Sequence, residues 1–178
     1  MLLRKINAVV SLLITVFLLV HAIYLAVWML SQGRIDENAI DVVPWVLTGL
    51  TLIHAFISID VVVSGLMSEE NTRKGRMYPK MNLSTLIQRA SGILMILFTG
   101  LHIAGAAGYM QPPKLVHGIV PPLFFLLVLA HIAVSTSKAF ITLGIGNAKF
   151  VKRVDLVMKV VCGVTLIADV VGFYLFVW

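Results

Sequence analysis

Five apolar runs of bilayer length limit what this chain can fold into. They lie at residues 6–30, 42–67, 86–110, 115–137 and 154–178 and take up most of the 178 residues. A helix needs about 20 mainly apolar residues to cross the hydrocarbon core of a bilayer. Because backbone N–H and C=O groups find no water there, each run is predicted to be a helix. The sequence therefore predicts an all-α integral membrane protein, one transmembrane domain of five helices over residues 1–178, with no soluble domain in its links.

The positions of the basic residues predict the orientation of the chain. Of the 14 lysines and arginines, only Arg34 and Lys114 fall in the links after the first and third runs. The others gather at the opposite ends of the runs. The positive-inside rule then places the N-terminus in the cytoplasm and the C-terminal Trp178 outside. The formal net charge of +6 is explained by this topology and by contact with lipid, and it does not indicate nucleic-acid binding.

Each of the first four runs contains one deeply placed histidine: His21, His54, His102 and His131. At about 1.5 Å per helical residue, His21 and His102 lie roughly 13 and 12 Å from the predicted outer face, and His54 and His131 roughly 18 and 24 Å. Two imidazoles facing each other across a helix bundle are the axial ligands that a six-coordinate b-type haem requires. The depths predict two such pairs, although any one histidine alone is as readily an interhelical hydrogen-bonding residue. The single Cys162 excludes a disulfide within the chain and a multi-cysteine metal site.

The third run opens with Gln88, Arg89, Ala90, Ser91 and Gly92. This segment resembles a motif of His or Gln, then Arg, any residue, Ser and Gly. That motif opens a helix at the cytoplasmic face in the cytochrome b membrane-anchor subunits of succinate dehydrogenases and quinol:fumarate reductases. With one histidine on each of the first four runs and none on the fifth, the whole chain resembles the single-chain, five-helix, di-haem type of anchor.

The resemblance implies two haem b cofactors in one helix bundle. A distal haem near the outer face would take His21 and His102, and a proximal haem near the cytoplasm would take His54 and His131. It also implies the quinone-reactive membrane subunit of an enzyme complex in a prokaryotic cytoplasmic membrane. Electrons would pass between menaquinone or another quinone and an iron–sulfur subunit, which relays them to an FAD-containing flavoprotein where succinate and fumarate interconvert. The sequence lacks the carboxylate beside His131 that some members use in a proton pathway.

Further polar residues lie where a haem or a quinone could reach them. Arg89 is a candidate partner of a haem propionate, since guanidinium and carboxylate form a bidentate pair, and its alternative role is to snorkel to the interface. Asp60 and Asp169, inside the runs, are candidates for a proton relay or for a hydrogen bond to a haem ligand, with a partly hydrated acid bonded to a hydroxyl as the alternative. The weaker candidates near a haem or a quinone are Gln88, Ser91, His117 and Tyr24.

Two other functions stay open at this stage. One is a b-type membrane subunit of another oxidoreductase, such as a hydrogenase or a formate dehydrogenase, which the motif around Arg89 disfavours. The other is a haem-free transporter or structural anchor, in which the histidines pack helices together or relay protons.

Overall fold

The structure of the chain, a computed structural model, describes residues 2–35, 42–66, 83–106 and 114–177, without the side chains of 65, 66, 106 and 114–117. Within these ranges it contains only helices: α1 (Leu2–Leu30), α2 (Val42–Leu66), α4 (Leu83–Ala106), α5 (Lys114–Leu143) and α6 (Ala148–Val177). All five are long and apolar enough to cross a membrane. The prediction of an all-α, multi-pass membrane protein with five spanning helices is confirmed.

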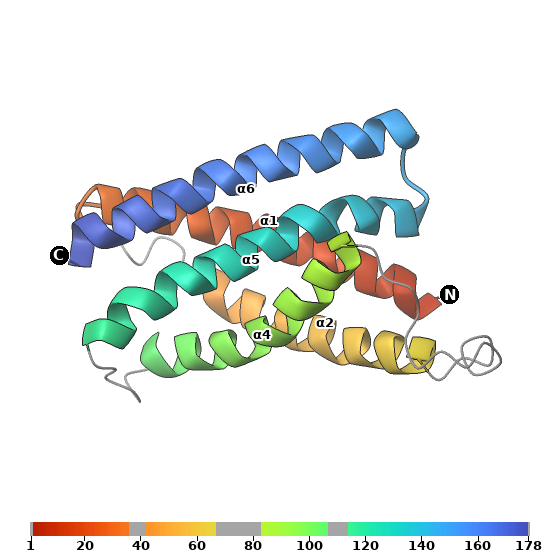
Figure 1. Cartoon of the computed structure of the whole chain (residues 1–178), viewed down its shortest axis with the longest axis horizontal. Coiled ribbons are helices and arrows are strands. Elements are labelled where there is room, and N and C mark those ends of the chain that lie inside the picture. The colour runs from red at the N-terminus through yellow and green to blue at the C-terminus, as the bar shows by residue number, and fades with distance from the viewer. Residues whose placement is uncertain (1, 36–41, 67–82, 107–113, 178) are drawn as a thin grey trace.

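The five helices alternate in direction along one bundle (Figure 1). α1, α4 and α6 run from the end that holds the N-terminus to the end that holds the C-terminus, and α2 and α5 run back. We call these the N-terminal end and the C-terminal end of the bundle. Arg4 lies in the first turn of α1 at the N-terminal end, and Lys152 and Arg153 lie in the second turn of α6 there, whereas Arg34 follows α1 at the other end. Basic residues 73, 74, 76 and 80 lie outside the described residues.

Packing divides the bundle into a close-packed side and a looser side. α1, α5 and α6 pack against one another, while α4 packs mainly on α5 and α2 mainly on α1. Figure 1 shows α6 on one side of the bundle and the pair α2 and α4 on the opposite side. The buried core lies between α5 and α6, where Val128, Leu129 and Ile132 meet Cys162. α2 and α4 therefore each have one main partner in the bundle.

The turn between α5 and α6 is much shorter than the predicted link over 138–153. α5 continues to Leu143 and α6 begins at Ala148. Gly144 and Gly146 adopt positive φ angles of 72° and 80°. The N–H of Ile145 donates to the carbonyl of Phe140 at 3.0 Å, a Schellman ending that suits a glycine at the preceding position. The Asn147 side chain accepts the N–H of Phe150 at 2.9 Å and caps α6. The two glycines and the asparagine cap thus let both helices continue into the polar segment, which lay outside the predicted apolar runs.

A hydroxyl from α6 satisfies a backbone carbonyl that a proline leaves open in α5. α5 stays helical through Pro121 and Pro122. Because proline has no N–H, Pro122 cannot donate to the carbonyl of Gly118 four residues earlier. The hydroxyl of Tyr174 donates to that carbonyl instead, at 3.0 Å. This bond ties the two helices together near the C-terminal end of the bundle.

We expect Gly146→Ala to destabilise the protein. A Cβ at this position would overlap the ring of Phe150, and the φ of 80° is strained for alanine. The expected loss in free energy of unfolding is about 1–3 kcal/mol, measured by thermal unfolding in mild detergent. The control is Gly163→Ala, since a Cβ there meets nothing within 4 Å and alanine favours a helix by up to about 1 kcal/mol. Equal stability of the two variants would contradict the turn described above.

Candidate functional site

A cavity of about 340 Å³ lies inside the bundle, with residues of all five helices in its wall. Its wall includes His21, His54, His102 and His131, the four histidines singled out from the sequence. Each comes from a different helix, in the order α1, α2, α4 and α5. Most of the remaining wall is aliphatic or aromatic, with a few hydroxyls. The fold therefore brings four imidazoles from distant parts of the chain to one apolar cavity.

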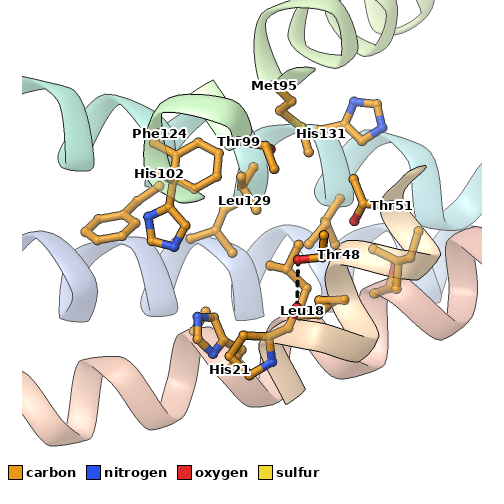
Figure 2. Close-up of a pocket in the computed structure, with 18 of the residues that line it drawn as sticks. Leu18, His21, Thr48, Thr51, Met95, Thr99, His102, Phe124, Leu129 and His131 are labelled. Carbon is orange, nitrogen blue, oxygen red and sulfur yellow. Dashed lines mark hydrogen bonds between the residues drawn. The ribbon is translucent and has the colours of Figure 1, made fainter. Parts of the chain in front are cut away.

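The histidines stand in two neighbouring pairs along the cavity. His21 and His102 lie close enough to interact electrostatically, and so do His54 and His131. Figure 2 shows His21 and His102 facing each other across one end of the cavity, with His131 at the other end. In the described part of the chain no three His, Cys, Asp or Glu side chains group to hold one metal ion. This proximity associates His21 with His102 and His54 with His131, and the ligation of haem by these pairs stays a prediction.

A serine lies within hydrogen-bonding distance of the ring of His131. The hydroxyl of Ser91 donates to the carbonyl of Ile87, at 2.6 Å. The same oxygen lies 3.0 Å from Nδ1 of His131, and which of these two atoms donates depends on the tautomer of the imidazole. In the tautomer that keeps the bond from the hydroxyl to Ile87, Nδ1 donates to the serine oxygen. In that tautomer, Nε2 bears a lone pair that is free for a ligand.

The other three histidines are held less tightly. Nδ1 of His21 and Nδ1 of His54 are buried without a hydrogen-bond partner in the described structure. Nε2 of His54 lies 3.5 Å from the hydroxyl of Ser58, a distance at the limit for a hydrogen bond. The ring of His102 rests against Phe124, with ring centroids 5.2 Å apart. His21 and His54 thus each keep a ring nitrogen that no described protein group uses.

A glycine of α4 lies against a histidine of the cavity. A Cβ at Gly100 or Gly105, near His102, would meet no atom within 4 Å. The glycine in contact with a histidine is Gly92, where a Cβ would lie 3.4 Å from Cε1 of His131. Both Ser91 and Gly92 of the motif thus contact the same imidazole.

A second, smaller cavity of about 180 Å³ adjoins the first near the N-terminal end of the bundle. His54 lies in the walls of both cavities. Arg4 and Lys138 supply positive charge to the smaller cavity, and Nζ of Lys138 donates to Oε1 of Gln88 at 2.8 Å. Arg89 lies within electrostatic range of Lys138 but is not in the wall of either cavity. Sequence reasoning assigned Lys138 to topology alone and missed its position beside the inner histidines.

The remaining candidates fall in different environments. Asp169 is 1% exposed and lines the large cavity. Asp60 is exposed on α2 and is not in the wall of either cavity, so the fold does not bring it to the histidines. Tyr24 is half-buried on α1 outside both walls. His117 lies in the first turns of α5, and its side chain is outside the described part of the structure.

Comparison with known proteins adds no assignment. No protein-family model matches the chain, and neither curated proteins nor solved structures give a match.

We expect a bulky residue at position 92 to disturb the inner end of the cavity. Gly92→Val would press its side chain into the ring of His131, because even a Cβ reaches to 3.4 Å of it. Overpacking of this kind costs about 1–3 kcal/mol, measurable as a loss in free energy of unfolding in detergent. Gly100→Val, two turns along the same helix and facing open space, is the matched control. If both variants unfold alike, Gly92 does not support the His131 ring.

Proposed function

We propose that this chain is a di-haem cytochrome b membrane anchor of a succinate dehydrogenase or quinol:fumarate reductase complex. The observation that carries the proposal is the pairing of four histidines, from four helices, along one apolar cavity. A helix bundle that presents facing imidazoles in a dry cavity meets the requirement for b-type haem ligation.

The donor atoms in the cavity fit this cofactor. An axial ligand must be a neutral imidazole with a lone pair on one nitrogen. For His131, the tautomer that donates from Nδ1 to Ser91 leaves Nε2 available. His21 and His54 keep a buried ring nitrogen with no protein partner. Two pairs of histidines also suit two separate haem irons, each with two axial ligands, better than they suit one metal ion that needs a cluster of ligands.

The charges around the inner pair suit the propionates of a haem. Arg4 and Lys138 line the small cavity that adjoins His54, and carboxylates pair favourably with such cations at partly buried sites. In the proposal Lys138 shares with Arg89 the role that the sequence suggested for Arg89 alone. The N-terminal end of the bundle, where these cations lie, would face the cytoplasm under the positive-inside rule.

The motif residues support the resemblance on which the enzyme class rests. Ser91 lies within hydrogen-bonding distance of Nδ1 of His131, Gly92 packs against its ring, and Gln88 accepts the hydrogen bond of Lys138. The first turns of α4 therefore orient the proposed ligand His131, leave room for its ring and hold Lys138 beside it. When bound, the haems would carry single electrons between menaquinone or another quinone and the cytoplasmic iron–sulfur and FAD subunits. The chain would hold the haems in line, exclude water from them and bind its partner subunits at the basic end.

Counting haem in single-histidine variants tests the ligand assignment. We expect two haem b per copy of this chain in the purified complex, measured as pyridine haemochrome. His21→Ala and His102→Ala should each lose the same haem, and His54→Ala and His131→Ala should each lose the other, because one axial ligand does not hold a six-coordinate haem. Redox titration of each variant identifies which haem remains.

The wild-type count decides between the proposal and its rivals. Absence of haem would overturn the proposal and favour a haem-free transporter or anchor. Haem with no succinate dehydrogenase or fumarate reductase activity in the complex would favour a b-type subunit of another oxidoreductase. Loss of the same haem in His21→Ala and His131→Ala would contradict the pairing.

Removing the hydroxyl of Ser91 should change the haem held by His131 and leave the other unchanged. Ser91→Ala deletes the acceptor of the Nδ1–H bond, and loss of such an outer partner typically weakens metal affinity about 10–100-fold. We expect faster loss of one haem on dilution and an altered low-spin EPR signal for that haem. Ser135→Ala is the control, since its hydroxyl donates to the carbonyl of His131 in its own helix and not to a ring. Identical spectra for the two variants would show that Ser91 does not orient the ligand.

A further inference from the structure

Asp169 is the most deeply buried ionisable side chain among the described residues. It lies on α6, is 1% exposed, and neither of its carboxyl oxygens has a hydrogen-bond partner in the described structure. It is also the one α6 residue in the wall of the large cavity, and none of the lysines and arginines that the structure describes lines that wall. A buried carboxyl without a partner is costly. The position of Asp169 therefore calls for a donor inside the cavity.

The packing of α6 on α1 places Asp169 at about the level of His21 along the bundle axis. A Cβ on Gly172 would lie 3.2 Å from Cβ of Met29 and 3.4 Å from the carbonyl of Ala26. The two helices run in the same direction (Figure 1), so Asp169, three residues before Gly172, is level with about residues 23–26 of α1. At about 1.5 Å per residue, His21 is then roughly 3–8 Å away along the bundle axis. Both side chains line the same cavity.

The two residues are chemically complementary. Nδ1 of His21 is buried without a partner, as are both oxygens of Asp169. A neutral imidazole that uses Nε2 as a ligand carries its proton on Nδ1 and needs an acceptor for it. The inner pair meets this need with the hydroxyl of Ser91 on His131. No hydroxyl holds His21 in this way in the described structure, and the carboxyl of Asp169 is the acceptor at its level.

We infer that Asp169 is the positioning residue for His21, accepting its Nδ1–H directly or through one water. This inference rests on the proposed haem function. A carboxylate acceptor makes the imidazole a stronger electron donor than a hydroxyl does and stabilises the oxidised iron. Asp169 would therefore lower the reduction potential of the haem held by His21 and His102. The hydroxyl of Ser91 would not lower the potential of the haem held by His54 and His131 in this way. The chain would in this way separate the potentials of two haems that share the same kind of axial ligands.

Redox titration of Asp169→Asn in the purified complex tests the inference. We expect both haems to be retained, the potential of the haem assigned by His21→Ala to rise, and the potential of the other haem to stay unchanged. The low-spin EPR signal of the first haem should shift as its imidazole becomes a weaker donor. Asp169→Glu keeps the charge and should return the potential toward that of the wild type. Thr165→Val is the control, because Thr165 is also buried on α6, at 5% exposed, but does not line the cavity.

The outcomes separate this inference from the proposed function. Two haems with unchanged potentials in Asp169→Asn would overturn the role of Asp169 and leave the cytochrome assignment intact. Equal shifts of both haems, or the same shift in Thr165→Val, would also overturn it, because they indicate a general loosening of the bundle. Wild-type protein without haem would overturn the proposed function itself. If Asp169→Asn does not assemble, Asp169→Glu tests the inference instead. We expect Asp169→Glu to keep the wild-type potential and EPR signal. Failure of Asp169→Glu to assemble, as in Asp169→Asn, would overturn the inference.

Discussion

The structure depends on the absence of water inside a bilayer, which obliges every polar group to find a partner within the protein. The backbone meets this demand by forming helices. Side-chain hydroxyls meet it on their own helices: Thr15 donates to the carbonyl of Ser11, and Thr136 to that of Ile132, each at 2.8 Å. Few buried side-chain atoms are left unpaired in the described residues, and all belong to His21, His54 and Asp169. Polar groups that the fold leaves unpaired in such a medium are the ones that point to a ligand.

The cavity follows from unequal packing of the helices. α1, α5 and α6 form a closed side, with Leu129 and Cys162 almost fully buried in it. α2 and α4 pack on different neighbours, and each contributes one histidine to the wall of the cavity, as α1 and α5 do. Figure 2 shows His102 and His131 in this wall.

The two ends of the cavity differ in how they treat their histidines. At the end that holds His131, Ser91 and Gly92 contact its ring, and cations stand nearby in the adjoining small cavity. At the end that holds His21 and His102, an aromatic ring contacts His102, and the buried carboxyl of Asp169 lines the cavity at about the level of His21. For a protein proposed to move electrons across a membrane, this asymmetry has a direct use. Two cofactors with like ligands acquire different potentials only through what surrounds them.

The sequence by itself determined the five helices and the position of each histidine along its helix, because apolar length and position along a helix are local properties. It underestimated α5 and α6, whose ends depend on the positive φ angles of Gly144 and Gly146 and on the cap by Asn147. It could not separate Asp60 from Asp169, two acids in apolar runs. Only the tertiary structure made Asp60 exposed and Asp169 buried, and only it placed Gly92 and Lys138 beside the inner histidines. The reason is physical: the rotation of a helix about its own axis is set by the neighbours it packs against, and that rotation decides which side chains share a cavity.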